Sequence, residues 1–264
     1  MKLLDSLTHV TPDGRWFNTG LDASEGRLLR EMDEVGVARA VVVGLAGFIS
    51  NDFVLEVCSR HSGRLIPGAS FNPAAHTTPR DAAMAVRSEL ESGPFGILKL
   101  HPRLGKYDPL DPRCLATLEE LSSWPRPPLL WLCTLFYAPG VVTQKPAVAA
   151  IRELVVRFPT LDFVLVHGGG VSVLELAEAV RGCENATLDL SFTLYRYSES
   201  SVWLDLRYLV RHFDHRTIYG SDFPEKGLRE SFSVFERLTE GADPGARDRI
   251  AGGNLARLLG RRVP

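Results

Sequence analysis

Residues Phe163-Val164-Leu165-Val166-His167-Gly168-Gly169-Gly170 decide the fold of this chain, because a short, continuously apolar run ends there in an ionisable residue followed by three glycines. A strand that is apolar on both faces is typical of a parallel sheet covered by helices. Similar runs, each ending in polar side chains, occur at 3–9, 97–101 and 217–222. Several strands of this kind indicate one sheet with one shared site where the strands end.

About eight strand-like runs follow one another along the chain, separated by segments whose apolar residues have helical spacing. This alternation favours a parallel sheet, and about eight units close naturally into a (β/α)8 barrel, the TIM barrel of the α/β class. We therefore predict a single TIM-barrel domain over residues 1–264, with an open, doubly wound sheet as the alternative. The predicted strands are 3–9, 41–45, 65–71, 97–100, 129–133, 163–167, 186–190 and 217–219.

The composition excludes several classes of protein. With 45% hydrophobic residues, 23% charged residues and a net charge of -2, the chain lacks the positive field that attracts nucleic acid or an anionic membrane. It has no apolar run of the roughly 20 residues that span a membrane, and Asp5 comes too early for a signal peptide. The four cysteines are far apart, which argues against a disulfide framework. We expect a cytoplasmic protein whose partners are small molecules.

Strand register predicts which polar side chains meet at the mouth of the barrel, because residues two apart on a strand share a face. The residues selected by this count are Asp5, Leu7 and His9 on the first strand; Lys99 and His101, followed by Arg103, on the fourth; Phe163, Leu165 and His167 on the sixth; and Asp189 and Ser191 on the seventh. The longest irregular stretches, 11–21 and 137–144, also follow strand ends and are expected to carry function.

Lys99, His101 and Arg103 place three potential cations at the end of one strand. In a slightly acidic protein, such a cluster is typical of a pocket that binds a carboxylate or a phosphate. The alternative is a solvated loop in which only Lys99 is buried and paired. Tyr195, after the seventh strand, is a further candidate for substrate binding. We therefore expect a small anionic substrate.

The strand-end motifs, taken in chain order, resemble the amidohydrolase-related branch of the amidohydrolase superfamily, and the resemblance covers nearly the whole chain. It implies a TIM-barrel enzyme that hydrolyses an amide, ester or lactone, or a non-oxidative decarboxylase, in most cases with a bound divalent metal. The matching motifs are Asp5-Ser-Leu-Thr-His9, Gly96-Ile-Leu-Lys99-Leu-His101-Pro102, Val166-His167-Gly-Gly, Tyr219-Gly-Ser-Asp222-Phe-Pro224 and Gly253-Asn254-Leu-Ala-Arg-Leu-Leu259.

Two positions depart from the pattern of that family. The family usually opens with Asp-x-His-x-His, but this chain has Leu7 at the first histidine and keeps only His9. The fifth strand of the family usually ends in a histidine, and Cys133 stands in that place here. The resemblance therefore implies a metal set of His9, Cys133 and Asp222, for which zinc is the best candidate because it accepts imidazole, thiolate and carboxylate together.

The role of Asp222 stays open between two mechanisms. In the first it is a metal ligand. In the second no metal is needed: Asp222 is a general base that activates water, His167 positions or protonates the reacting group, and the basic cluster stabilises an oxyanion. A barrel whose metal site has decayed, and which binds a small anion without turnover, is a third alternative. The sequence does not separate hydrolysis from decarboxylation, and it leaves a homodimer open.

Overall fold

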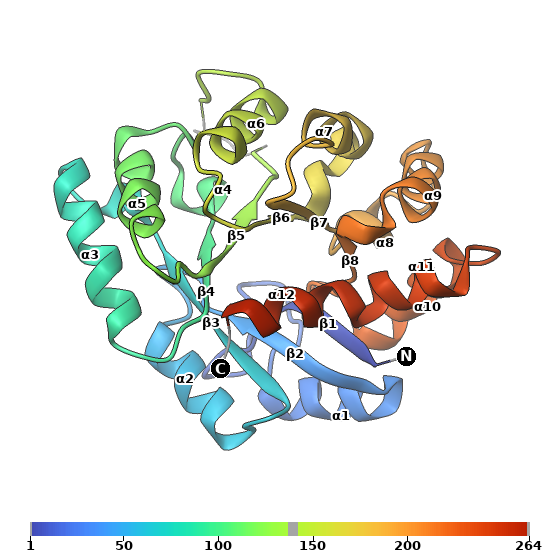
Figure 1. Cartoon of the computed structure of the whole chain (residues 1–264). Helices are drawn as coiled ribbons and strands as arrows, with labels where there is room; N and C mark the ends of the chain where they lie inside the picture. The colour runs from blue at the N-terminus through green and yellow to red at the C-terminus, as the bar shows by residue number, and fades with distance from the viewer. Residues whose placement is uncertain (1, 137–141, 263–264) are drawn as a thin grey trace.

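The computed structural model describes residues 2–136 and 142–262, so part of the predicted functional stretch 137–144 lies outside the described residues. Eight parallel strands pair in chain order, each with the next, and helices surround them (Figure 1). In this part of the chain no helix has the length and apolar character needed to cross a bilayer. The strands are β1 Leu3–Thr8, β2 Val37–Val43, β3 Leu65–Phe71, β4 Ile97–Leu100, β5 Leu129–Cys133, β6 Phe163–Val166, β7 Ala186–Asp189 and β8 Thr217–Ile218.

Backbone hydrogen bonds between the first-strand segment and the residues that follow the last strand close the barrel. The Ser6 N–H donates to the Tyr219 carbonyl at 3.2 Å, and the His9 N–H donates to the Phe223 carbonyl at 2.8 Å. The chain is therefore a single-domain TIM barrel, as the alternation of strand and helix predicts, and the open sheet is not observed.

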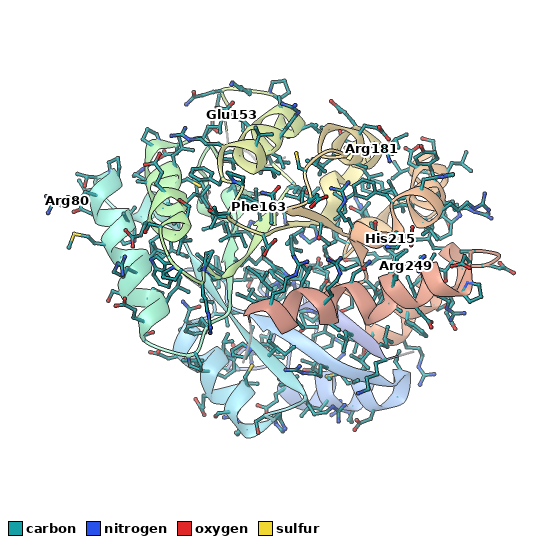
Figure 2. The ribbon with its side chains drawn as sticks, in the orientation of Figure 1. Arg80, Glu153, Phe163, Arg181, His215 and Arg249 are labelled. Carbon is teal, nitrogen blue, oxygen red and sulfur yellow. The ribbon has the colours of Figure 1, made fainter. Side chains whose placement is uncertain are left out.

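The helices begin where local chemistry satisfies their first N–H groups. At the start of α3, the Thr78 hydroxyl accepts from the Asp81 N–H and the Asp81 carboxylate accepts from the Thr78 N–H, with Pro79 in the first turn. In Figure 2 the charged side chains Arg80 and Glu153 lie at the periphery. The helices are α1 Glu25–Val35, α2 Asn51–Arg60, α3 Pro79–Glu91, α4 Pro102–Gly105, α5 Pro112–Ser122, α6 Ala147–Arg157, α7 Val173–Ala179, α8 Thr193–Arg196, α9 Val202–His212, α10 Leu228–Leu238, α11 Pro244–Asp248 and α12 Asn254–Arg262.

The inside of the barrel is a separate apolar cluster, distinct from the larger one between strands and helices. The final helix, α12, lies across the strands (Figure 1) and adds three leucines to this inner cluster, so it forms the floor of the barrel. The members of the inner cluster are Leu4, Leu7, Val41, Val43, Ile66, Ile97, Leu129, Trp131, Val164, Val166, Ile218, Leu255, Leu258 and Leu259.

The first strand is irregular, with a register shift between Asp5 and Thr8. Leu4 and Leu7 are three positions apart, yet both pack inside the barrel. Simple alternation therefore fails here, and the count of alternate residues does not decide whether Asp5 shares a face with Leu7. In this irregular segment the Ser6 carbonyl accepts a hydrogen bond of 2.8 Å from the indole N–H of Trp131, whose side chain comes from β5.

Candidate functional site

Lys99 on β4 and His9 after β1 form the centre of the candidate site, and each is only 2% exposed. The Lys99 Nζ lies 3.1 Å from the His9 Nε2, and the His9 Nδ1 lies 2.7 Å from the Val43 carbonyl oxygen. Because a carbonyl only accepts, Nδ1 must carry the proton, and Nε2 presents its lone pair to the lysine. This geometry fixes the tautomer of His9 and directs one N–H of the Lys99 ammonium toward the imidazole.

Lys99 is a buried cation without a direct ion pair among the residues that the structure describes. Burial lowers its pKa, and the negative charge of Asp222 is the largest effect that opposes this. Lysines are almost never fully buried unless they are paired. A lysine held in this way, at the carboxyl end of a barrel strand, is a candidate for a functional group.

Asp222 follows β8 in the left-handed backbone conformation, with φ of 59°, which is uncommon for a residue other than glycine. Its side chain is 7% exposed, and within the described part of the chain no group donates a hydrogen bond to its carboxylate. Burial raises its pKa to about 7, although the Lys99 charge opposes the shift. At neutral pH this carboxyl group can therefore both accept and release a proton, as a general base must.

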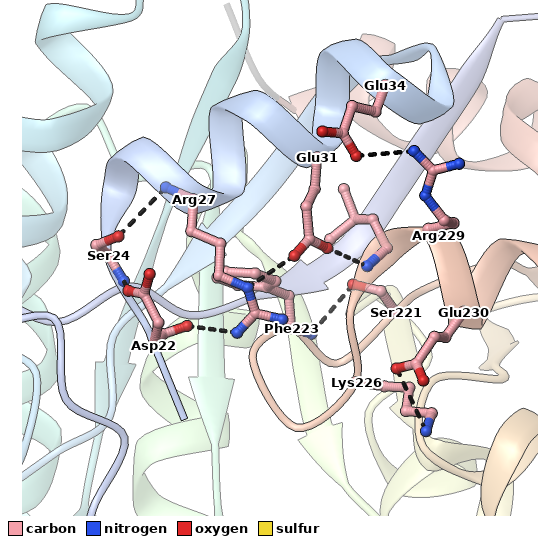
Figure 3. A network of polar contacts seen from close by, with 11 residues as sticks. Asp22, Ser24, Arg27, Glu31, Glu34, Ser221, Phe223, Lys226, Arg229 and Glu230 are labelled. Carbon is pink, nitrogen blue, oxygen red and sulfur yellow. Dashed lines mark hydrogen bonds and ion pairs between the residues drawn. The ribbon is translucent and has the colours of Figure 1, made fainter. Parts of the chain in front are cut away.

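Helix α1 holds the loop that follows Asp222 (Figure 3). The Glu31 carboxylate accepts a 2.7 Å hydrogen bond from Arg27 and a 2.6 Å hydrogen bond from the backbone N–H of Leu228. The Arg27 guanidinium also lies 4.8 Å from the centre of the Phe223 ring. These contacts anchor the loop on both sides and so fix the position of the carboxylate.

His167 reaches the site through a bend of the backbone. On β6, Val164 and Val166 pack inside the barrel, whereas Phe163 and Leu165 pack against the helices. The sequence predicts that Phe163, Leu165 and His167 share the face that points into the mouth of the barrel. For Phe163 and Leu165 this prediction is wrong, because both face the helices. The φ of 67° at His167, followed by three glycines that also have positive φ, redirects the chain at this point.

The hydrogen bonds around His167 determine its protonation state. Its Nδ1 lies 3.1 Å from both the carbonyl and the hydroxyl oxygen of Ser191, and that hydroxyl donates to Asp189. Both Ser191 oxygens therefore accept, so Nδ1 carries the proton and Nε2 holds a lone pair. Burial, assisted by the Lys99 charge, lowers the pKa of His167 to about 3. The imidazole is neutral near pH 7 and acts there as an acceptor.

Asp189 belongs to the candidate site through hydrogen bonds that the sequence did not reveal. Its buried carboxylate accepts from the hydroxyls of Ser6 and Ser191 and, at 3.2 Å, from the backbone N–H of His167. The register count on the seventh strand selected Asp189 and Ser191 as residues of the mouth, which is the only signal that pointed to them. Asp189 thus orients His167 through Ser191.

The basic cluster contains two cations and one neutral imidazole. The Nδ1 of His101 accepts from the Leu104 N–H at 3.2 Å, and His101 begins α4 as its N-cap. Burial, together with the charges of Lys99 and Arg103, holds the pKa of His101 well below its ordinary value. The interpretation of His101 as a third cation is therefore wrong, and the positive charge of the cluster comes from Lys99 and Arg103.

Arg103 and Tyr195 lie at the edge of the same centre. The Arg103 charge contributes to lowering the pKa of His167 and opposes the raised pKa of Asp222, and its side chain is half-buried. The Tyr195 hydroxyl is buried without a hydrogen-bond partner among the described residues, and burial raises its pKa. The edge of the site therefore holds a half-buried arginine and a protonated phenol.

The side chains expected to hold a metal do not fit one in this arrangement. The Lys99 ammonium engages the lone pair of the His9 Nε2, so that nitrogen is not free to coordinate. Burial raises the pKa of the Cys133 thiol, and its Sγ lies 3.9 Å from the Leu135 carbonyl oxygen, as suits a protonated donor. Across residues 2–136 and 142–262, no three His, Cys, Asp or Glu side chains group as metal ligands would.

A small cavity adjoins Lys99. Its volume is about 10 Å³, and its lining includes Lys99, His101 and Ser70. The Ser70 hydroxyl is buried and has no hydrogen-bond partner in the described part of the chain. The cavity has about the size of one water molecule, and its polar lining suits one.

A TIM barrel whose buried ionisable side chains gather at the carboxyl ends of its strands has the architecture of an enzyme. The chain belongs to the amidohydrolase family, whose family model matches residues 9–261, and it is an enzyme of the amidohydrolase type. This confirms the family that the strand-end motifs resemble. No curated protein matches the sequence.

Solved structures share this fold over the full length. An uncharacterised TIM-barrel protein from Bordetella bronchiseptica is 21% identical with a TM-score of 0.79, covering 99% of each chain. A probable 2-pyrone-4,6-dicarboxylic acid hydrolase from Acinetobacter baumannii, with citric acid bound, is 18% identical with a TM-score of 0.68, covering 98% of this chain and 100% of that one. A 5-carboxyvanillate decarboxylase from Novosphingobium aromaticivorans, complexed with manganese, is 10% identical with a TM-score of 0.65, covering 98% and 96%.

Proposed function

We propose that the protein is a metal-independent hydrolase of a small ester, lactone or amide that carries a carboxylate or phosphate group. The observation that carries the proposal is the contact of 3.1 Å between the Lys99 Nζ and the His9 Nε2. A fixed ammonium stands where the imidazole lone pair would otherwise hold a metal ion, beside the Asp222 carboxyl whose pKa is about 7.

In this mechanism Asp222 removes a proton from water as the water attacks the carbonyl carbon of the substrate. Negative charge develops on the carbonyl oxygen, and the Lys99 ammonium stabilises it in a water-poor site, where a fixed charge acts strongly. The protonated Asp222 then returns its proton to the leaving group. The neutral His167 accepts a hydrogen bond from the water or the substrate through its free Nε2 and holds it in place.

Arg103 and Tyr195 would bind the anionic end of the substrate. A guanidinium suits a planar carboxylate because it offers two parallel N–H donors. The buried phenol of Tyr195, which lacks a hydrogen-bond partner among the described residues, is an additional donor. The Acinetobacter baumannii structure, which holds citric acid, supports a small carboxylate as the kind of ligand that this fold accommodates.

A decarboxylase using the same residues is the second candidate, favoured by the likeness to a 5-carboxyvanillate decarboxylase. That neighbour contains manganese, so a metal-dependent reaction is the competing mechanism. In this chain such a mechanism would use zinc bound by His9, Cys133 and Asp222. A barrel that only binds a small anion is the third. Each of these makes a different prediction for the purified protein.

The test combines metal analysis with a turnover screen. We expect protein purified without added ions to contain less than about a tenth of an equivalent of transition metal and to hydrolyse lactones or esters of dicarboxylic acids in the presence of EDTA. Asp222→Asn should lower kcat by roughly 10²–10⁴-fold. Asp248→Asn, at an exposed aspartate at the end of α11, is the matched control and should leave kcat unchanged.

Other outcomes identify the alternatives. Activity that follows the content of bound metal would refute the metal-independent mechanism. Release of CO₂ from a carboxylate substrate would establish the decarboxylase. Saturable binding of dicarboxylates without any turnover would leave only the binding protein.

A further inference from the structure

A cavity of about 890 Å³ lies at the amino ends of the strands, at the end of the barrel opposite the candidate site. Its lining comes from the segments that directly precede β6, β7 and β8, and from α12, the helix that forms the floor of the barrel. Two of the lining residues, Arg181 and His215, are labelled in Figure 2, on the side of the view opposite Arg80. A ligand in this cavity would therefore be remote from the residues at the mouth.

The charge of this lining is predominantly positive, because it contains four guanidinium groups and two carboxylates. Arg181 pairs with Glu178, which is not part of the lining, and Arg261 lies 3.9 Å from Asp162. The other two arginines form no ion pair with any residue that the structure describes. An excess of positive charge therefore faces the cavity. The charged lining residues are Arg181, Arg216, Arg257, Arg261, Asp162 and Glu184.

The two arginines without an ion pair are held in place by backbone carbonyls. The Arg216 guanidinium donates to the Cys183 carbonyl at 2.5 Å and to the Val180 carbonyl at 3.1 Å. The Arg257 guanidinium donates to the His215 carbonyl at 3.0 Å. These acceptors are uncharged, so they fix the positions of the two groups while the positive charges stay without a counter-ion.

Arg181 and Arg216 also lie close to each other, because both stand over the ring of Phe213. Their guanidinium carbons are 5.5 Å and 4.4 Å from the centre of that ring. Arg216 is half-buried, and burial, assisted by the Arg181 charge, lowers its pKa. Like charges held this close repel each other, and an anion bound between them would remove that repulsion. A cap on the carbonyls that follow α7 explains the position of Arg216, but it does not explain why α12 directs Arg257 and Arg261 to the same cavity.

We infer that this cavity is a second binding site, separate from the candidate active site, for a small molecule that carries a diphosphate group. A guanidinium presents paired N–H donors that match the oxygens of a phosphate, and a diphosphate offers two such groups side by side. Asp162 and Glu184 interrupt the positive surface, and the chain has a net charge of -2. This distribution suits a compact ligand better than an extended polyanion such as RNA.

Such a ligand would join the floor of the barrel to three loops. It would bind the folded protein only, since the unfolded chain does not bring α12 and the segments before β6, β7 and β8 together. Binding of this kind stabilises the fold in proportion to the logarithm of the ligand concentration. We therefore expect the ligand to raise the stability of the protein without contacting the residues at the mouth of the barrel.

The test is isothermal titration calorimetry of the full chain with inorganic pyrophosphate at constant ionic strength. We expect saturable binding that Arg257→Gln weakens by about tenfold, together with a urea midpoint that pyrophosphate raises less in this variant than in the wild type. Arg257 is exposed, so its replacement should leave the fold intact. Arg80→Gln, at an exposed arginine of α3, is the matched control and should bind pyrophosphate as the wild type does.

The same titrations in Lys99→Met and in Arg103→Met separate this cavity from the candidate active site. In both backgrounds the pyrophosphate affinity that depends on Arg257 should persist. Its loss in either would place the ligand at the mouth of the barrel and overturn the inference, as would wild-type affinity in Arg257→Gln or an equal loss in Arg80→Gln. Sulfate or malonate that binds as tightly as pyrophosphate would refute the diphosphate as the ligand.

Discussion

Asp5 makes the folded protein sensitive to pH, and replacing it with asparagine exposes the effect. The side chain is completely buried, and its Oδ1 accepts hydrogen bonds of 3.1 Å from the Leu7 N–H and 3.0 Å from the Ser221 N–H. Its Oδ2 has no partner among the described residues. Burial therefore raises the pKa of Asp5 from 3.8 to about 7.

The magnitude follows from the difference between the two pKa values. Between pH 4 and pH 7 the unfolded chain releases the Asp5 proton, while the folded protein keeps it. The contribution to stability is therefore fully present below the unfolded pKa and is lost as the pH rises through the folded value. Each pH unit is worth about 1.4 kcal/mol, so roughly 4 kcal/mol of unfolding free energy is lost over this range.

The assay is urea unfolding of the wild type and Asp5→Asn at intervals between pH 4 and pH 8. Asparagine keeps the shape and the accepting oxygen but cannot ionise. As the pH rises, the unfolding free energy of the variant should therefore gain roughly 4 kcal/mol relative to that of the wild type. The pKa values of His9, His101 and His167 are lowered, so these residues make the unfolding free energy rise with pH. This rise is the same in both proteins and cancels when the free energy of one is subtracted from that of the other. Asp13→Asn, at an exposed aspartate, should run parallel to the wild type.

A difference in unfolding free energy between the wild type and Asp5→Asn that stays constant from pH 4 to pH 8 would refute the reasoning. It would mean that water or a rearrangement satisfies the Oδ2 atom and that the carboxyl group ionises in the folded state as readily as in the unfolded chain.

Four further predictions follow from single contacts. Gly220→Ala would place a Cβ 2.5 Å from the Ser6 hydroxyl oxygen, so we expect a loss of about 1–3 kcal/mol in denaturant unfolding, and unchanged stability would contradict the packing. Trp131→Phe removes the donor to the buried Ser6 carbonyl and should cost about 1–3 kcal/mol; a change below about 0.5 kcal/mol would mean that the carbonyl finds another partner. With Asp222 as base and a pKa of about 7, log kcat/KM should rise with pH below 7 and level off above it, and a flat profile from pH 5 to 8 would exclude this role. A crystal structure should show an ordered water bonded to the Ser70 hydroxyl beside Lys99, and a dry cavity there would be the contrary result.

The barrel could be predicted from the sequence because each buried parallel strand needs a short apolar run, and such runs are visible in the sequence. The boundaries were less accurate where polar residues interrupt a run. Strand β2 begins at Val37 and not at residue 41, since Arg39 lies within the strand and hides its first half. The start of α3 depends only on local residues, because Thr78, Pro79 and Asp81 form a capping sequence that can be recognised in the chain.

The sequence selects candidate members of the site but not their geometry. Lys99 is selected because it continues the regular alternation of β4 from Ile97, which faces the interior. His167 and Asp222 have left-handed backbones, and counting alternate residues cannot anticipate where such a side chain points. The neutral state of His101 was equally hidden, since it depends on burial and on neighbours that only the folded chain brings together.

The floor of the barrel has a consequence for how the chain folds. Leu255, Leu258 and Leu259 complete the inner apolar cluster, and they lie on α12, which follows β8 in the chain. Synthesis therefore delivers all eight strands before the residues that seal the inside from water. We expect the growing chain to expose apolar surface until α12 docks, so that the barrel reaches its native state as one cooperative unit and does not accumulate strand by strand on the ribosome.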